Sequence, residues 1–560
     1  MPFSLLRRIS VRQILVAGCL VTLLYALFSR GVYHSDEHYQ ILEYAHMKLF
    51  GTPTVDHLSW EYPSQMRPGI QPFVAWALCR GLVAAGIWSP YLAVTLLQLL
   101  SGLLSVVVLG FFYRTIRGTL TSESQRKWFL LTGLCLWFMA YLHVHFNAEM
   151  LSGNLLLLLV ALTIRYCPAA AEGSGTDGCR HPHEHDFRRG VILGAVAGAL
   201  FIVRYQMGFA LLGYGVWLLV YARRWRLYAG MIPGVVGMLL LGLWADHWLY
   251  GEWTFTPWNY LRENILQGRM DQFRHRPWWY YLTAPVLDGG IFFGLLALVS
   301  TLGFFWRHPR HVVTWMLVPF LLVHFFLAHK EIRFFFPVLF LVPWFLVELF
   351  RGAGSRFARR ERRWMVGFLA VLNLGAMTYN LTQTTPDIYF YRVMRDQCRG
   401  KGRVVALNLA AESTYYSRMP DIAGERRVIE ARFYMPDNLE NLHCTTPEEL
   451  ERTARRLAAE GCRVLILSAD PDLADKSPLR LRKIVWSPYP AWVVRYFNFN
   501  DWTRYAVRSK NIYELEPSAG MTDVAALPSA DSDLAAWCCS RASSCSLMPI
   551  PAAYPVILPS

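Results

Sequence analysis

A series of apolar segments constrains the fold of this chain more than any other feature. Segments of about 18–22 residues recur through the first two thirds of the sequence, and each can cross a hydrocarbon core about 30 Å thick. Hydrophobic residues make up 54% of the 560 residues, and charged residues make up only 17%. A water-soluble protein of this length is rarely so apolar. The sequence therefore predicts a polytopic α-helical membrane protein.

About eleven of these segments are expected to be transmembrane helices. They lie at 11–28, 91–113, 127–145, 150–166, 189–203, 207–221, 228–248, 285–305, 311–328, 334–350 and 364–381. The apolar segment 71–86 is shorter, and we interpret it as a juxtamembrane or re-entrant helix. It is therefore left out of the count.

Basic residues fall in alternate loops between these segments. The loops in question carry Arg7, Arg8 and Arg12; Arg114, Arg117, Arg126 and Lys127; Arg165, Arg180, Arg188 and Arg189; Arg223, Arg224 and Arg226; Arg307 and Arg310; and the arginines of 351–363. Cytoplasmic loops carry such an excess, so the N-terminus is expected in the cytoplasm. The opposite loops, including 29–70, 329–333 and all residues after 381, are expected outside. The net charge of +15 is thus explained by topology, and no nucleic-acid partner is expected.

The chain is expected to have three parts. Residues 1–381 form the transmembrane domain, whose first outer loop is 29–70. Residues 382–517 change character and predict a small extracytoplasmic α/β domain, with strands at 404–409 and 464–468 and a helix at 448–460. Residues 518–560 are rich in Ala, Ser and Pro and are expected to be flexible. The 11 cysteines lack the spacing of a zinc site, so no metal is predicted.

Two adjacent carboxylates, Asp36 and Glu37, follow the first span. Neighbouring residues on a helix point about 100° apart, so one carboxylate is expected to face a site. The other is expected to pair locally with His34, His38 or Lys48. A carboxylate at the membrane surface is a suitable general base for a hydroxyl nucleophile. The alternative is an ordinary helix start with an acidic first turn.

Further charged residues lie on the same expected side of the membrane. They are Arg67, Glu149, Arg204, Lys330 and Arg333. Guanidinium groups bind phosphate through two hydrogen bonds, and charged groups at membrane depth usually face a cavity or a partner. The alternative for each cation is that it extends to the lipid headgroups. The aromatic segment 255–281 suits sugar rings, isoprenoid chains or an ordinary interfacial belt.

Several of these motifs together resemble one family. The motifs are His34–His46, Leu58–Tyr62, Met66–Pro68, Phe255–Asn264, Arg276–Tyr280 and His329–Pro337. In this order they resemble the family 22 glycosyltransferases, and within them the GPI mannosyltransferase 3 and Alg9-like branch. The resemblance covers roughly residues 15–380 and implies the GT-C architecture, with the site facing away from the cytosol.

The resemblance also implies an activity and roles for individual residues. It implies an inverting mannosyltransferase that moves mannose from a polyprenyl- or dolichyl-phosphate carrier to a hydroxyl of a lipid-linked glycan or glycolipid. Asp36 corresponds to the proposed base, with Glu37 beside it. The residues expected at the donor phosphate and sugar are Arg67, Arg204, His329, Lys330, Glu331 and Arg333. Those expected at the acceptor or in support of the site are His38, Trp60, Glu61, Glu149, Asn259 and Trp278.

Some alternatives stay open at this point. The segment Met66–Pro72 resembles bacterial members more closely, which favours the bacterial cytoplasmic membrane over the endoplasmic reticulum membrane and argues against a GPI acceptor. The sugar could be another one, such as arabinose. A lipid or glycan transporter is the rival class, although the sequence lacks repeat symmetry. No cofactor is required by the expected reaction, although the carboxylates could bind a divalent metal.

Overall fold

The protein is described here from a computed structural model. The described residues are 8–29, 34, 36–51, 58–168, 185–272, 275–351, 359–382, 386–409, 418–420, 426–428, 432–436, 438–444, 446–468, 472–485 and 511–516. The flexible tail expected at 518–560 lies outside them.

The first part of the chain forms a series of helices. They are α2 (Val11–Phe28), η1 (Glu37–Leu42), α3 (Glu43–Phe50), α4 (Ile70–Ala84), α5 (Pro90–Ile116), α6 (Glu123–Cys135), α7 (Trp137–Leu142), α8 (Ala148–Tyr166), α10 (Asp186–Val203), η4 (Tyr205–Met207), α11 (Gly208–Trp217), η5 (Leu218–Ala222), α12 (Trp225–Tyr250), α13 (Thr256–Leu261), η6 (Arg262–Leu266), η7 (Arg269–Gln272), α14 (Tyr280–Asp288), α15 (Ile291–Arg307), α16 (Val312–Phe326), η8 (Ile332–Phe335), α17 (Phe336–Leu339), α18 (Val342–Leu349), α19 (Arg359–Thr382) and α20 (Pro386–Cys398).

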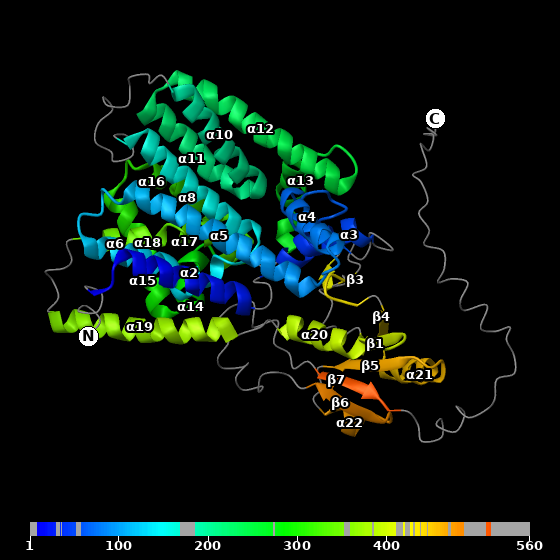
Figure 1. Ribbon diagram of the computed structural model, residues 1–560. Coiled ribbons are helices and arrows are strands. Elements are labelled where there is room, and N and C mark those ends of the chain that lie inside the picture. The colour runs from blue at the N-terminus through cyan, green and yellow to red at the C-terminus, as the bar shows by residue number, and fades with distance from the viewer. Residues whose placement is uncertain are drawn as a thin grey trace, which may run out of the picture.

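The last part of the chain contains strands. Its elements are β1 (Val404–Leu409), β2 (Arg418–Pro420), β3 (Arg426–Val428), β4 (Leu439–Cys444), α21 (Pro447–Ala459), β5 (Arg463–Ser468), α22 (Leu473–Lys476), β6 (Leu481–Val485) and β7 (Asn511–Leu515). Figure 1 shows the helices as one large body and the strands as a smaller one beside it.

Six of the described helices are long and apolar enough to cross a membrane, or seven if the bent pair 332–339 and 342–349 is one span. They are α2, α5, α8, the segment 205–222, α12 and residues 364–381. The remaining expected spans coincide with helices that are shorter, interrupted or more charged: α6 with α7, α10, α15 and α16. Length and composition thus support six or seven spans, and the count of eleven stays a prediction. The chain is a membrane protein.

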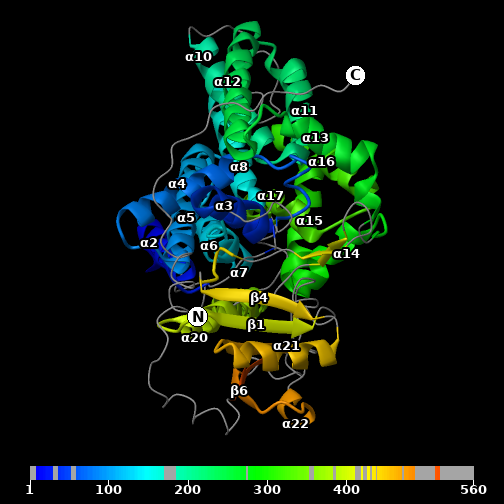
Figure 2. The same cartoon turned by 90° about the vertical axis from the view of Figure 1, so that its right-hand side faces the viewer.

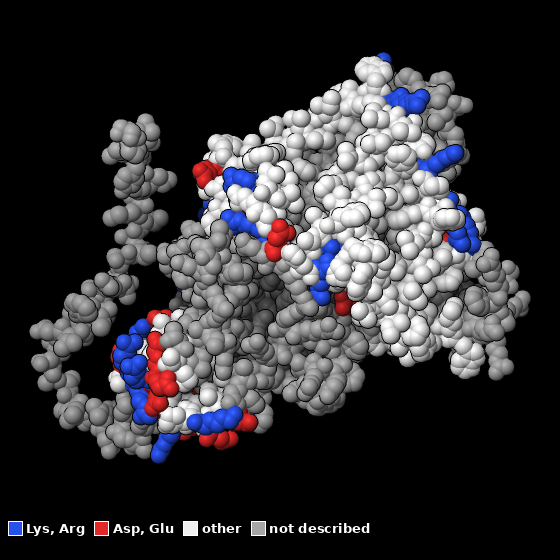
Figure 3. Space-filling view, turned by 180° about the vertical axis from the view of Figure 1, so that it is seen from behind, with Lys and Arg blue, Asp and Glu red and all other residues white. Residues whose placement is uncertain are grey.

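Helix α8 is central to the helical body, and α12 is peripheral. About two thirds of the apolar window of α8, 67%, is buried, against 22% for α12. The largest apolar cluster lies between α5, α6, α8, α11, α16 and α18. Figure 3 shows a mostly uncharged surface over the helical body, whereas charges of both signs gather at lower left, over the strands and α21. Such an uncharged surface suits contact with lipid.

Five of the strands form a mixed sheet in the order β4-β1-β5-β7-β6, and β2 pairs with β3 in a separate two-stranded antiparallel sheet. Strand β1 runs parallel to β4 and β5, and β7 runs antiparallel to β5 and β6. Side chains alternate across a strand, so Val405 and Leu407 meet α21 while Val404 and Ala406 join an apolar cluster with α20. The expected strands and helix are confirmed to within one residue at each end, and Figure 2 shows the sheet below the helical body.

Glycines allow α10 and α12 to pack closely against each other. A Cβ at Gly190 would lie 2.2 Å from the Leu227 carbonyl oxygen, and one at Gly194 would lie 2.2 Å from that of Met231. The contact is reciprocal, because a Cβ at Gly230 would lie 2.1 Å from the carbonyl oxygen of Phe187. Small residues at such positions let two helix backbones approach closely within a membrane.

The acidic segment after the first span is also held by the last part of the chain. Glu43 is buried, and its Oε1 lies 2.6 Å from His38 Nε2 and accepts a hydrogen bond from the Phe433 N–H at 3.0 Å. The His38 ring packs edge-on against Tyr391 and Tyr434, with centroids 5.9 and 5.2 Å away. Residues about 390 positions apart thus share one buried polar contact.

The close contact of α10 with α12 predicts a stability difference between two glycine variants. Gly194→Ala should destabilise the protein by about 1–3 kcal/mol, because the added methyl group meets a backbone carbonyl that cannot move aside. Gly237→Ala is the matched control on α12, since an added Cβ there has no neighbour within 4 Å. Unfolding midpoints in detergent compare the two. Equal midpoints for both variants would show that the helices do not need this approach.

The Glu43 contact predicts a second difference. Glu43→Ala leaves His38 and the Phe433 N–H buried without this acceptor, so it should destabilise the protein by about 2–4 kcal/mol. Glu440→Ala is the control, because Glu440 pairs with Arg403 at the surface and should matter little. Thermal unfolding in detergent measures both variants. The contact would be unimportant if Glu43→Ala unfolded at the same temperature as Glu440→Ala.

Candidate active site

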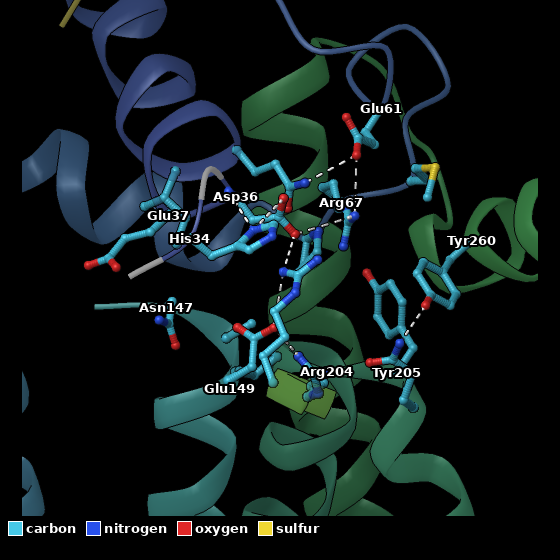
Figure 4. Close-up of a pocket in the computed structure, with 18 of the residues that line it drawn as sticks. His34, Asp36, Glu37, Glu61, Arg67, Asn147, Glu149, Arg204, Tyr205 and Tyr260 are labelled. Atoms are coloured by element: carbon cyan, nitrogen blue, oxygen red, sulfur yellow. Dashed lines mark hydrogen bonds and ion pairs between the residues drawn. The ribbon is translucent and has the colours of Figure 1, made fainter. Parts of the chain in front are cut away.

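A cavity of about 150 Å³ opens where the acidic segment meets the ends of several helices. It is lined by His34, Asp36, Glu37, Gln40, Ile41, Trp60, Glu61, Met66, Arg67, Pro68, Gln71, Pro72, Asn147, Ala148, Glu149, Val203, Arg204, Tyr205, Gln206, Tyr260, Asn264, Met270, His329, Glu331, Arg333 and Phe334. The structure therefore brings the early and late charged motifs together, as the sequence predicts. Figure 4 shows these side chains converging from separate elements.

Arg333 connects three carboxylates at the centre of the cavity. Its Nη1 lies 2.5 Å from Asp36 Oδ2 and 3.3 Å from Glu149 Oε1, and its Nε donates to Glu331. The three acids come from the start of η1, the first turn of α8 and the segment before η8. One guanidinium thus ties together parts of the chain that are up to 297 residues apart.

Asp36 stays ionised in this setting. Burial alone would raise the pKa of Asp36, but Arg333, His34 and Arg67 outweigh it and hold that pKa well below its usual value. His34 Nδ1 lies 3.2 Å from Asp36 Oδ1. The same balance of burial against Arg333 and the neighbouring histidines lowers the pKa of Glu331. The carboxylate of Asp36 is therefore available as an acceptor at neutral pH.

Arg204 has hydrogen-bond donors that remain unused. Its Nη1 lies 2.7 Å from Glu149 Oε1, so this cation has a partner within the site. Its Nε and Nη2 are buried and have no partner among the described residues. The guanidinium also lies 5.6 Å from the centre of the Phe334 ring. Buried polar groups are usually hydrogen-bonded, so this arginine has capacity for an anionic ligand.

Arg67 lies between two carboxylates of the cavity, those of Asp36 and Glu61. Its Nη2 lies 3.9 Å from Asp36 Oδ2 and 3.3 Å from Glu61 Oε1. Gln40 donates to the same Glu61 oxygen at 3.1 Å. Arg67 therefore has a defined position between Asp36 and Glu61, and Figure 4 shows these contacts as dashed lines.

Glu37 differs from Asp36 in both direction and partner. It points away from the arginines in Figure 4, and its Oε2 lies 3.0 Å from His145 Nδ1. Its Oε1 accepts a hydrogen bond from the Phe146 N–H at 3.0 Å. The expectation that the two carboxylates have different surroundings is confirmed. Among the expected local partners, His34 pairs with Asp36, and Glu37 also contacts His145, which lies in the connection between α7 and α8.

Four of the expected site residues do not line the cavity. His38 pairs with Glu43, and Lys330 Nζ donates to the carbonyl oxygen of Arg276 at 3.1 Å. Asn259 donates to the Gln65 carbonyl oxygen at 3.1 Å. Trp278 is 64% exposed. The first three hold the surrounding loops in place, and Trp278 lies at the surface.

Several lining residues were not expected from the sequence. They are Gln40, Gln71, Gln206, Tyr260 and Asn264. Gln206 donates to the Tyr260 hydroxyl at 2.9 Å. Uncharged polar residues give no signal of their own in sequence, although Gln206 lies only two positions from Arg204. Tyr260 and Asn264 fall within the aromatic motif, but only the fold shows which of its residues point inward.

The cavity contains carboxylates and histidines, but their arrangement does not resemble a metal site. Within the described part of the chain, no group of three or more His, Cys, Asp or Glu side chains is placed to hold a metal ion. The carboxylates that meet in the cavity are instead bridged by arginines.

The chain is similar in sequence to known mannosyltransferases. The chain is 28% identical over 363 residues to GPI alpha-1,2-mannosyltransferase 3 of Xenopus laevis, covering 61% of this chain and 60% of that protein. It is 24% identical over 323 residues to the mannosyltransferase APTG1 of Arabidopsis thaliana, covering 56% of this chain and 54% of that protein. The chain thus spans between half and two thirds of the length of these relatives.

A solved structure has a similar fold. The crystal structure of ArnT from Cupriavidus metallidurans bound to undecaprenyl phosphate aligns with a TM-score of 0.52 and 13% identity, covering 90% of this chain and 98% of that chain. This likeness supports the GT-C fold. The sequence itself matches the Alg9-like mannosyltransferase family, also called family 22 glycosyltransferases, over residues 13–400. This chain therefore belongs to the Alg9-like mannosyltransferase family and has the GT-C fold.

Proposed function

We propose that this protein is an inverting mannosyltransferase that takes mannose from a polyprenyl- or dolichyl-phosphate carrier. The acceptor is a hydroxyl group of a lipid-linked glycan or glycolipid. The observation that carries this proposal is a single cavity in which the ionised Asp36 lies beside Arg204 and Arg333. A transferase of this kind needs a proton acceptor next to a binding site for a leaving phosphate.

Arg204 is the first candidate to bind the carrier phosphate. Two of its buried nitrogen atoms have no partner among the described residues, so an anion can bind without displacing an existing contact. Hydrogen bonds between a guanidinium and a phosphate are among the stronger ones, because both groups are charged. His329, Glu331 and Arg333 complete this side of the cavity.

Arg333 connects donor binding to the strength of the base. In the structure this arginine pairs with Asp36, which lowers the pKa of that carboxyl and makes it a weak base. A bound phosphate competes with Asp36 for the same guanidinium. As the phosphate takes over these hydrogen bonds, the pKa of Asp36 should rise and the carboxylate becomes a better proton acceptor. Binding of the donor thus prepares the base.

The reaction is then a single displacement. The acceptor oxygen attacks C1 of the mannosyl group while its proton moves to Asp36. The bond between C1 and the phosphate oxygen breaks, and the lipid phosphate leaves with the bonding electrons. Arg204 and Arg333 stabilise the negative charge that develops on that oxygen. Attack from the side opposite the phosphate inverts the configuration at C1.

We further propose that the cavity opens on the extracytoplasmic side, with the N-terminus in the cytoplasm and the strand-containing part outside. The basic loops support this orientation, and the resemblance of Met66–Pro72 to bacterial members favours a bacterial cytoplasmic membrane. A reporter that is active only in the cytosol, fused after residue 400, should remain inactive. The same reporter fused after Arg117 should be active. A strong signal from the first fusion would place the site on the wrong side for this proposal.

The donor is tested directly with the purified full-length protein. Incubation in detergent with polyprenyl-phosphate mannose and a glycolipid extract should consume the donor and release polyprenyl phosphate. Polyprenyl-phosphate arabinose tests the other sugar, and passage of lipid without loss of sugar would indicate a transporter. We expect no dependence on a metal, so activity should survive EDTA. Consumption of arabinose alone would contradict the proposed sugar.

Asp36→Asn is the sharpest test of the mechanism. The change keeps the size of the side chain but removes the proton acceptor, so transfer should fall by about 10²–10⁴-fold. Glu37→Gln is the matched control, because Glu37 pairs with His145 away from the arginines and should lose much less. Rates of mannose transfer measure both variants. If Glu37→Gln were inactive and Asp36→Asn active, Glu37 would be the general base. If both variants were active, neither residue would be the general base.

A further inference from the structure

The cavity has a second polar region, which Arg67 connects to Asp36. We define it by four lining residues, Gln40, Trp60, Glu61 and Gln71. Whereas the region around Arg204 contains unused cationic donors, this one presents a carboxylate, two amides and an indole. Its chemistry is different, and the proposed function has not yet used it.

Two polar atoms in this region have no partner among the described residues. They are Glu61 Oε2 and Gln71 Nε2. Both side chains are almost completely buried, with only 3% and 4% of their surface exposed. A buried carboxylate oxygen or amide N–H without a hydrogen bond is costly, by about 1–3 kcal/mol. Such a cost is acceptable where a ligand completes the hydrogen bonds.

The ligand of this region is not the phosphate. Glu61 is anionic, and the nearest cation, Arg67, already pairs with both Glu61 and Asp36. An anionic group would therefore meet repulsion here. Hydroxyl groups fit instead, because a hydroxyl can donate to the carboxylate oxygen of Glu61 and another can accept from the amide N–H of Gln71.

Trp60 adds a feature that suits a sugar. Its ring is nearly buried, and the guanidinium of Arg269 lies 5.2 Å from its centre. The indole offers a rigid apolar surface with a polar edge. The apolar C–H face of a hexose can lie against such a surface while its hydroxyl groups reach the neighbouring carboxylate and amide.

We propose that Glu61 and Gln71 form a hydroxyl-binding subsite for a hexose, beside the base of the reaction. This inference rests on the proposed function and adds to it the residues that recognise the sugar. Arg67 connects the subsite to Asp36, since it contacts both carboxylates through one nitrogen atom. The hexose is either the one carried by the lipid phosphate or the terminal one of the acceptor, and the same hydroxyl chemistry serves both.

Binding measurements distinguish the hexose of the lipid carrier from the hexose of the acceptor. The probes are polyprenyl-phosphate mannose, polyprenyl phosphate without sugar, and octyl α-mannoside as a mimic of the acceptor sugar. The variants are Glu61→Gln and Gln71→Leu in the full-length protein. Glu252→Gln is the surface control, because Glu252 is exposed and accepts a hydrogen bond from the side chain of Gln65. Arg204→Ala is the comparison for the phosphate.

The transferred hexose is the ligand if both variants bind the mannosylated carrier more weakly and bind the sugar-free carrier as before. We expect a loss of about tenfold to a hundredfold for Glu61→Gln and about three- to tenfold for Gln71→Leu. Unchanged binding of the sugar-free carrier also shows that the variants are folded. Arg204→Ala should weaken both carriers alike. Loss of octyl α-mannoside binding alone would assign the subsite to the acceptor hexose.

Two results would contradict the two proposals separately. Normal affinity of both variants for the mannosylated carrier and for octyl α-mannoside would overturn the subsite. Failure of the unmodified protein to bind either lipid phosphate would overturn the proposed donor, while octyl α-mannoside would still test the subsite. Glu252→Gln should match the unmodified protein with every probe.

Discussion

The arrangement of this site depends on the ion pairs that the guanidinium of Arg333 makes with three carboxylates. It pairs with Asp36 from the first outer loop, Glu149 from the start of α8 and Glu331 from its own segment. A buried charge is costly unless it is paired, so each of these acids needs the arginine and the arginine needs them. Helices that enter the membrane independently are thereby fixed relative to one another at their ends, where the cavity lies.

The arginines of the cavity pair with its carboxylates, but some of their polar atoms have no partner among the described residues. Arg204 shares Glu149 with Arg333 and keeps two nitrogen atoms without a partner among the described residues. Glu61 likewise has one oxygen with no partner in the described part of the chain, while Arg67 and Gln40 bind its other oxygen. Unused donors and an unused acceptor thus occur in two separate regions. A substrate with an anionic part and a hydroxylated part complements such a cavity, which explains why one site can suit a phosphate-linked sugar.

The sequence predicted the parts of this fold that depend on local patterns. Apolar segments marked helices such as α5 and α12, short apolar runs marked β1 and β5, and the charged motifs marked Asp36, Arg204 and Arg333. Long-range pairing was not predictable, so the contact of Glu37 with His145 was missed, because only folding brings these two residues together. Gln71 and Tyr260 carry no charge and look like ordinary interfacial residues in sequence. The helix is interrupted at Leu136, between α6 and α7. The sequence has no proline there, so a continuous span over 127–145 was expected.

The contact between Glu43 and the Phe433 N–H has a consequence for the order of assembly. Glu43 belongs to the helix that continues from η1, yet one of its hydrogen-bond donors is synthesised 390 residues later. During translation the first helices are inserted long before that donor leaves the ribosome. Until then, a buried position for Glu43 lacks one of its partners. The acidic segment should therefore reach its final geometry only after the segment that contains Phe433 has been synthesised, which leaves a nascent chain without a competent site during insertion of the helices.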